Sequence, residues 1–298
     1  MNRVPKVSII INCFNGEKYL DVAINSVISQ TFKNWELIFW DNKSSDKSAK
    51  IFNKYNDDRF KYFKADKHTL LYEARDLAIN HCNGDLISFL DTDDWWGKNK
   101  LEKQIKAFDN PKVGLCCTNF WIVNEKKNKT YLAFKNKFPE SKVLDFFLKK
   151  NFVNISTLMI RKKAYKMLDV GFDHSYEMIG DFDLVVRLLL SWKLTSIQSP
   201  LVHYRWHSNN LSNTKVFLNN EEKFTWIKKM KAQGKLINNP SYKYFVNKTI
   251  FYKILNYIYQ NRRNKALKEV YSLDLLKYQF LSGLAILTPL YVLKLLRS

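Results

Sequence analysis

The sequence is poor in glycine, proline and cysteine, and acidic side chains are scarce relative to basic ones. It contains eight glycines, six prolines and four cysteines among 298 residues. Its hydrophobic content of 46% with 26% charged residues is typical of a globular protein, which excludes a disordered chain or a collagen-like fibre. Lysine and arginine outnumber aspartate and glutamate by 49 to 28. The net charge of +21 predicts an anionic partner: a nucleic acid, a membrane surface or a phosphorylated substrate.

The cysteines show no metal-binding or redox pattern. They form no C-x-x-C pair, and no histidine lies at zinc-ligand spacing from them. The adjacent Cys116 and Cys117 would point to opposite faces of a strand, which suits packing better than bridging. We therefore expect free, buried thiols in a reducing cytosol.

Long uncharged apolar segments are also lacking. The apolar run at residues 7–11 is too short for a signal peptide and is closed by Asn12, so it indicates a buried strand. No uncharged apolar stretch reaches the 18 residues of a membrane-spanning helix. The nearest candidate, residues 280–293, is interrupted by Pro289 and followed by Lys294. The sequence leaves open whether residues 278–296 enter a membrane or pack in a helical domain.

The positive charge is concentrated in the last third of the chain. Residues 213–298 hold 16 basic and four acidic residues, a net charge of +12. Lysines and aromatic residues interleave there without a nucleic-acid-binding motif, so we expect no nucleic-acid partner. An interfacial helix on anionic lipid is favoured, with a plain core helix as the alternative. Its candidate residues are Leu275, Leu276, Phe280, Leu284 and Leu287, flanked by Lys277, Lys294 and Arg297.

Strand-like and helix-like segments alternate through the first half of the chain. The expected strands cover residues 7–14, 35–40, 60–65, 85–90 and 113–120. Helical patterns separate them, and such repeated βα units predict an α/β fold with a mostly parallel sheet flanked by helices. Ligands of such sheets bind at the carboxyl ends of the strands, where Asp41 and Asp91 fall. Later segments predict a strand at 155–160, a helix at 181–190, a strand at 201–206 and helices after 213.

Three aspartates follow the expected strand at residues 85–90, in the run FLDTDDWW at residues 89–96. Side chains two residues apart share a face of a strand, so Asp91 and Asp93 can converge on one cation. Carboxylate oxygens suit Mg²⁺ or Mn²⁺ bound together with substrate phosphates. Such an ion neutralises the charge on a diphosphate leaving group. Taken alone, the short D-x-D pattern also suits an acidic turn that solvates the end of a strand.

Five other segments form a sequence pattern together with this aspartate run. They are VSIIINCFNG at 7–16, QTF at 30–32, WDNKSSD at 40–46, ARDLAI at 74–79 and GDLISFLD at 84–91. In order and spacing, residues 5–120 closely resemble the family 2 glycosyltransferases, which are inverting enzymes with the Rossmann-like GT-A fold. The resemblance implies transfer of a sugar from a nucleoside-diphosphate sugar, with UDP favoured, to a saccharide acceptor. It further implies a lipid-linked or cell-surface polysaccharide precursor, and a peripheral location at the inner face of the cytoplasmic membrane.

The same resemblance assigns roles to residues by position. Asp41 would hydrogen-bond the nucleotide base, Arg75 would lie beside the nucleotide, and the backbone from Asn12 to Asn15 would cradle it. Asp91 would engage the ribose and Asp93 the metal ion. Phe14 and Thr92 complete the nucleotide side, whereas Asp94, Trp95, Gly180 and Arg205 are placed on the donor-sugar and acceptor side. An Asx turn is the alternative for Asp46 and, less so, for Asp41.

A general base is needed to remove a proton from the acceptor hydroxyl. In the family this base follows a glutamate, in a Glu-Asp pair before x-D-L-x-x-R-L. Here Asp181 aligns with the base, while Gly180 stands where the family has the glutamate. The alternative for Asp181 is a helix N-cap. In PLVHYRWHSNNLS at 200–212, a block similar to the family's, His207 would close over the diphosphate or metal and His203 would be structural.

The resemblance also divides the chain. Residues 1–212 would form the glycosyltransferase domain, with a nucleotide-sugar-binding half at 1–120 and an acceptor half at 121–212. Residues 213–298 would be the basic helical region. A sugar nucleotidyltransferase is the rival enzyme class, but its glycine-rich phosphate loop is lacking at residues 7–18. A non-catalytic relative is disfavoured because Asp41, Asp91, Asp93 and Asp181 are all present.

Overall fold

The computed structural model describes residues 6–289 and divides them into two compact units. The first unit comprises residues 6–143 and 152–210, and the second comprises residues 144–151 and 211–289. Lys294 and Arg297, predicted to flank the apolar C-terminal stretch, lie outside the described residues. All four cysteines are free and buried, as expected.

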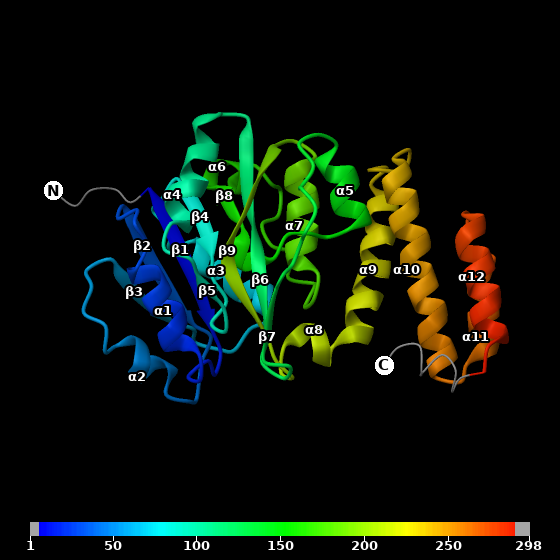
Figure 1. The fold of residues 1–298 in the computed structure, drawn as a ribbon, viewed down its shortest axis with the longest axis horizontal. Coiled ribbons are helices and arrows are strands. Elements are labelled where there is room, and N and C mark those ends of the chain that lie inside the picture. The colour runs from blue at the N-terminus through cyan, green and yellow to red at the C-terminus, as the bar shows by residue number, and fades with distance from the viewer. Residues whose placement is uncertain (1–5, 290–298) are drawn as a thin grey trace. The chain divides into compact units, whose positions relative to one another are not determined.

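The first unit contains a nine-stranded mixed sheet with the order β3-β2-β1-β4-β8-β6-β9-β5, in which β7 pairs with β6 (Figure 1). The strands that share one direction are β1 (Val7–Cys13), β2 (Trp35–Asp41), β3 (Phe60–Lys64), β4 (Leu86–Phe89), β6 (Val113–Asn124) and β9 (Lys193–Trp206). The opposing strands are β5 (Trp95–Trp96), β7 (Lys129–Leu132) and β8 (Met159–Arg161). The predicted α/β architecture is confirmed.

The side chains of β1 point alternately to the two faces of the sheet. Val7, Ile9, Ile11 and Cys13 lie in one core cluster with the buried side of α1 (Leu20–Ile28), because alternate residues of a strand share a face. Helix α3 (Leu71–Ile79) also packs on β1 and β2. The remaining helical segments of this unit are α2 (Ser48–Phe52), α4 (Lys100–Ile105), the 3₁₀ turns η1 (Lys106–Asp109) and η2 (Ile155–Thr157), α6 (Lys162–Lys166) and α7 (Gly180–Leu189).

Two predicted strands differ most in their bounds from the structure, while β6 extends four residues beyond the predicted end at 120. Residues 155–160 do not form one strand, because the Asn154 side chain accepts a hydrogen bond from the Ser156 N–H and begins the turn η2 before β8. Strand β9 begins at Lys193, eight residues before the predicted start at 201. Its register with β6 shifts around Pro200, and proline inside a strand is tolerated at such irregularities.

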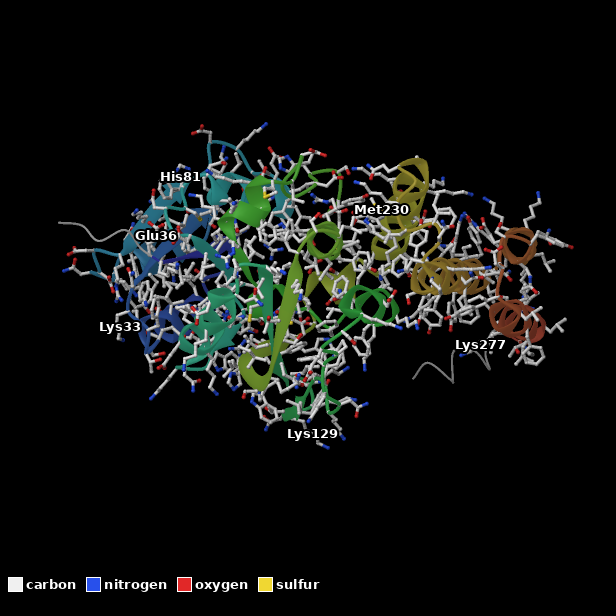
Figure 2. All side chains as sticks on the ribbon, turned by 90° about the horizontal axis from the view of Figure 1, so that it is seen from above. Lys33, Glu36, His81, Lys129, Met230 and Lys277 are labelled. Atoms are coloured by element: carbon white, nitrogen blue, oxygen red, sulfur yellow. The ribbon has the colours of Figure 1, made fainter. Side chains whose placement is uncertain are left out.

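The second unit is helical, as predicted. It contains α8 (Leu211–Thr214), α9 (Val216–Ala232), α10 (Pro240–Tyr259), α11 (Arg263–Val270) and α12 (Leu276–Leu287), together with α5 (Val143–Lys149) apart from its first residue. Asn239 caps α10 by accepting hydrogen bonds from the N–H groups of Ser241 and Tyr242. Met230 on α9, labelled in Figure 2, is buried. Among residues 6–289, no helix combines the length and apolar character that crossing a membrane requires.

Candidate functional site

The loops that follow β1 and β2 are bound to each other at the carboxyl edge of the sheet. Asn15 has a φ of 53°, a left-handed conformation that asparagine tolerates better than most residues. Its Oδ1 accepts a hydrogen bond from the Ser45 N–H at 2.9 Å, and its own N–H donates to Ser44 Oγ at 3.1 Å. The Gly16 N–H donates to Ser48 Oγ at 3.0 Å. These bonds fix the backbone that is predicted to cradle a nucleotide.

Asp41 lies beneath these loops and is only 1% exposed. Its Oδ1 accepts a hydrogen bond from the Ser44 N–H at 2.7 Å, and its Oδ2 accepts one from the Tyr62 hydroxyl at 2.6 Å. An Asx-turn bond thus forms at Asp46, which accepts the Ser48 N–H two residues on, whereas the partner of Asp41 lies three residues on. Since two carboxylate oxygens offer about four lone pairs, these bonds do not exhaust its capacity to accept from a base.

An exposed aromatic surface accompanies Asp41. Phe14 is 51% exposed, and its ring centroid lies 4.1 Å from that of His68. His68 is held next to Asp41 by a 3.1 Å contact between its Nδ1 and the carbonyl oxygen of Asn42. A planar base has a π-face that can stack on such a ring. The predicted nucleotide residues Phe14 and Asp41 thus belong to one edge of the sheet.

Arg75 joins helix α3 to the aspartate run. It is 2% exposed, and its Nη2 donates to Asp91 Oδ1 at 2.6 Å. Thr92 lies against the β1 loop, because a Cβ on Gly16 would be only 3.1 Å from the Thr92 Cβ. Asn12 Nδ2 is buried and has no hydrogen-bond partner within residues 6–289. A buried amide donor without a partner is costly, so it indicates a position that a ligand can complete.

Asp93 lies beside residues 207–210, which follow the end of β9. Its Oδ2 is 3.0 Å from His207 Nε2 and accepts a hydrogen bond from Asn210 Nδ2 at 3.2 Å. One oxygen from each of Asp91, Asp93 and Asp94 lies within 4.8 Å of the others. The structure therefore brings the two predicted metal ligands, Asp93 and His207, together, while their binding of a metal stays a prediction.

The electrostatics of this acidic cluster fit a divalent cation. Burial, followed by the neighbouring Asp91, raises the pKa of Asp93, and the hydrogen bond to His207 opposes that shift. Burial, followed by Asp93 and Asp91, raises the pKa of Asp94 well above its usual value. Carboxylates that raise one another's pKa are stabilised in their charged form by a nearby cation. Carboxylate oxygens are suitable ligands for Mg²⁺ or Mn²⁺.

Asp94 differs from its neighbours because it is 1% exposed and turned into the protein. Its Oδ2 accepts a hydrogen bond from Ser156 Oγ at 2.6 Å, and its Oδ1 accepts one from the Arg205 N–H at 3.0 Å. The Arg205 guanidinium lies near the ring faces of Trp95 and Tyr19, at 4.7 and 4.3 Å from their centroids. Asp94 and Arg205 thus connect the aspartate loop to β9. Their contact with a sugar stays a prediction.

Trp95 and His203 stack in parallel across β5 and β9, with ring centroids 4.8 Å apart and an interplanar angle of 2°. Burial lowers the pKa of His203, which favours its neutral form. This packing agrees with the structural interpretation of His203.

Asp181 lies in the first turn of α7. That helix begins at Gly180 with Ile179 as its N-cap, so the N-cap interpretation of Asp181 is wrong. Asp181 Oδ1 accepts hydrogen bonds from the Phe182 N–H at 2.7 Å and from the Tyr72 hydroxyl at 3.3 Å. Burial raises the pKa of Asp181, while the nearby Arg75 opposes the shift. The Asp181 carboxylate therefore lies close enough to Arg75 for their charges to interact, while its role as general base stays a prediction.

Sequence reasoning missed Tyr72, Ser156 and Asn210, each of which holds one of the aspartates. Asn210 lies in the segment at 200–212 that resembles the family, and its place as a polar neighbour of His207 was a signal that could have found it. Ser156 and Tyr72 gave no local signal, because their partners are 62 and 109 residues away in the chain.

Comparisons with known proteins agree with this geometry. The profile of the family described as Glycosyl transferase family 2 matches residues 8–168. The UDP-Glc:alpha-D-GlcNAc-diphosphoundecaprenol beta-1,3-glucosyltransferase WfgD of Escherichia coli is 27% identical over 85% of this chain and 92% of its own length. The putative teichuronic acid biosynthesis glycosyltransferase TuaG of Bacillus subtilis is 29% identical over 72% of this chain and 84% of its own.

Among solved structures, residues 1–349 of S. aureus TarS in complex with UDP superimpose with a TM-score of 0.58. That match has 19% identity and covers 83% of this chain and 80% of TarS 1–349, so it supports the GT-A fold. Because the family profile covers more than half of the sequence, this glycosyltransferase belongs to glycosyl transferase family 2.

Proposed function

We propose that this chain transfers a sugar from a UDP-sugar to a lipid-linked saccharide, with inversion at the anomeric carbon. The observation that carries the proposal is that Tyr72 connects Asp181 to the Arg75–Asp91 pair: its hydroxyl donates to Asp181 at 3.3 Å, and its ring centroid lies 5.5 Å from the Arg75 guanidinium. A general base at Asp181 would therefore lie close to the residues that would hold the donor. The relative WfgD supports the substrate classes, since its name specifies a UDP-glucose donor and an acceptor on diphosphoundecaprenol.

The donor site is assembled from the loops at the carboxyl edge of the sheet. The nucleotide base would stack on Phe14 and donate a hydrogen bond to the Asp41 carboxylate. The buried amide N–H of Asn12 would donate a hydrogen bond to an oxygen of the nucleotide sugar. Arg75 and Thr92 would flank its ribose and diphosphate. Asp93, with His207, would hold Mg²⁺ or Mn²⁺, Asp91 would engage the ribose, and the ion would neutralise charge on the leaving diphosphate when bound.

The transfer step needs one base and no covalent intermediate. Asp181 accepts the proton of the acceptor hydroxyl while that oxygen forms a bond to the anomeric carbon. The bond from this carbon to the diphosphate oxygen breaks, and UDP leaves with the electron pair. Attack opposite to the leaving group inverts the configuration. Burial raises the pKa of Asp181, with Arg75 opposing, which brings the carboxylate closer to the pH at which general bases work well.

A donor screen tests this proposal. Release of nucleoside diphosphate from UDP-, GDP- and dTDP-sugars is measured with Mg²⁺, with Mn²⁺ and with a chelator. We expect metal-stimulated release from a UDP-sugar. Asp181→Asn should keep nucleotide binding but lower kcat by about 10²–10⁴, the usual contribution of a general base. Asp85→Asn makes the same change at an exposed position and should leave kcat unchanged. Wild-type turnover by folded Asp181→Asn would refute the assigned base.

We further propose that the second unit binds an anionic membrane surface through α12, at the inner face of the cytoplasmic membrane. Leu276, Phe280, Leu284 and Leu287 form a stripe along one side of this helix and are between 56% and 82% exposed. The opposite side, with Tyr278, Ser282, Ala285 and Ile286, is buried. The core interpretation of this segment thus holds for one side of α12 only.

Charge favours an anionic lipid as the occupant of the exposed stripe. Residues 213–298 have a net charge of +12, and Lys277, labelled in Figure 2, is exposed on α12. Each basic residue near an anionic surface contributes roughly 1 kcal/mol, and the attraction fades beyond a Debye length of about 8 Å. An enzyme held in this way would stay close to a lipid-linked acceptor.

Sedimentation with vesicles tests the membrane proposal. We expect the full chain to sediment with vesicles of phosphatidylglycerol and phosphatidylcholine at low salt, and less at high salt. Changing Leu276, Phe280 and Leu284 together to serine should abolish sedimentation. Leu267→Ser, at an exposed leucine of α11, is the matched control and should sediment normally. A wild-type chain that stays in the supernatant at low salt would refute the proposal.

A further inference from the structure

Gly180 leaves no room for a side chain because the ring of Tyr72 lies against it. An ideal Cβ on Gly180 would be 2.5 Å from both Cγ and Cδ2 of Tyr72, a distance that real Cβ atoms do not reach. The Tyr72 ring cannot easily move away. It is 3% exposed and stacks on Phe172 at 5.5 Å between centroids, and Phe172 in turn contacts the edge of Phe89.

The hydroxyl of Tyr72 reaches the residue that follows Gly180. It donates to Asp181 Oδ1 at 3.3 Å, and the same oxygen accepts the Phe182 N–H at 2.7 Å. Both hydrogen bonds recorded for this carboxylate within residues 6–289 therefore fall on Oδ1. Oδ2 is the oxygen left to accept a proton. Burial raises the pKa of the Tyr72 phenol well above its usual value, so it stays a donor at neutral pH.

We propose that Tyr72 is a positioning residue that fixes the Asp181 carboxylate with Oδ2 toward the acceptor hydroxyl. Tyr72 also fills the space that a side chain at position 180 would occupy. In this chain a neutral phenol thus takes the place of the glutamate that resembling sequences have before the base. The inference rests on the proposed role of Asp181 as general base and assigns a residue that controls its orientation.

Two structural consequences make the inference testable. Removing the hydroxyl while keeping the ring should free the carboxylate to rotate without opening a cavity. Adding a side chain at position 180 should be tolerated only if the ring is removed at the same time. Positions 72 and 180 should therefore behave non-additively, as expected for residues in direct contact.

The first experiment compares Tyr72→Phe with Tyr165→Phe. Tyr165 is a matched control because its hydroxyl also contacts a carboxylate, that of Asp76, and its ring packs on the same Phe172. We expect Tyr72→Phe to lower kcat about tenfold or more, the loss of a hydrogen bond to a charged group, with the donor KM changed less than twofold. Tyr165→Phe should leave kcat unchanged. Nucleotide binding by calorimetry on the same preparations reports that each variant is folded.

The second experiment is a rescue. Gly180→Ala should lower the melting temperature and kcat, and adding Tyr72→Ala should restore the melting temperature. The pair Tyr72→Ala with Gly180→Glu should recover kcat relative to Tyr72→Ala alone. A wild-type chain without turnover would refute the proposed function. Turnover that depends on Asp181 but is unchanged in Tyr72→Phe, or strictly additive effects at the two positions, would refute only the role of Tyr72.

Discussion

A buried lysine provides a quantitative test of the structure of the catalytic unit. Lys100 is the first residue of α4 and is 0% exposed. Its Nζ donates to Ser88 Oγ at 3.0 Å and lies 3.8 Å from the centroid of a Trp96 ring. No carboxylate pairs with it among the ion pairs of the described residues. Burial therefore lowers its pKa well below 10.5, and the positive end of the helix disfavours its charge further.

The lowered pKa has a definite sign in stability. Between the folded-state pKa and about 10.5 the unfolded chain binds one more proton than the folded chain. The free energy of unfolding therefore rises with pH in this window, by at most about 1.4 kcal/mol per pH unit. Below the folded-state pKa the full penalty is present. Lys100→Met keeps the shape of the side chain and removes the penalty, so this variant should be the more stable protein at neutral pH.

Urea unfolding of wild type and Lys100→Met between pH 6 and pH 9 measures this effect. The difference between the two curves cancels the titration of all other groups. We expect the advantage of Lys100→Met to shrink as the pH rises. Lys103→Met, at an exposed position of the same helix, should follow wild type throughout. Parallel curves for wild type and Lys100→Met would show that Lys100 stays charged in the folded protein, and would refute the reasoning.

Two further predictions concern the donor site. Asp93→Asn should keep the circular dichroism of wild type yet lose most metal-stimulated turnover, because it removes a charge from the acidic cluster; equal turnover after chelation of the metal would contradict this. Phe14→Ala should weaken UDP binding about tenfold in calorimetry, since stacking of a base on an aromatic ring contributes roughly 1–3 kcal/mol. Leu70→Ala, at another exposed apolar residue, should bind UDP as wild type does.

The sheet could be predicted from the sequence because its central strands are covered on both faces. Such strands are continuous apolar runs, and β1 and β2 are buried almost throughout. The turn residues after each run then place Asp41 and Asp91 at one edge without further information. The same reasoning fails where the strand is irregular. Most of residues 193–200 are exposed or half-buried, so they form no continuous apolar run. Pro200 also argues against a strand, although β9 continues through it.

The partners of the site residues could not be predicted, because they depend on tertiary packing. Ser156 comes from a 3₁₀ turn that Asn154 caps, and its hydroxyl reaches both the Asp94 carboxylate and the Asp91 N–H. Tyr72 occupies a position in α3 that predicts only a buried aromatic residue. The sequence did contain one indication, the glycine at position 180. The reason for a glycine there, the Tyr72 ring that lies against it, is evident only from the structure.

The spacing of the run D-x-D-D does not distinguish the roles of its three aspartates, but their surroundings in the structure do. Asp91 is paired with a buried arginine, so its charge is compensated from within the protein. His207 compensates the negative charge of Asp93 only in part, so Asp93 is the aspartate of this run that a cation would stabilise most. Asp94 is buried on a serine hydroxyl and a backbone N–H, so it holds the loop in place. Because Asp94 anchors the loop that carries Asp93, the third aspartate would act on the proposed metal site through the position of that loop.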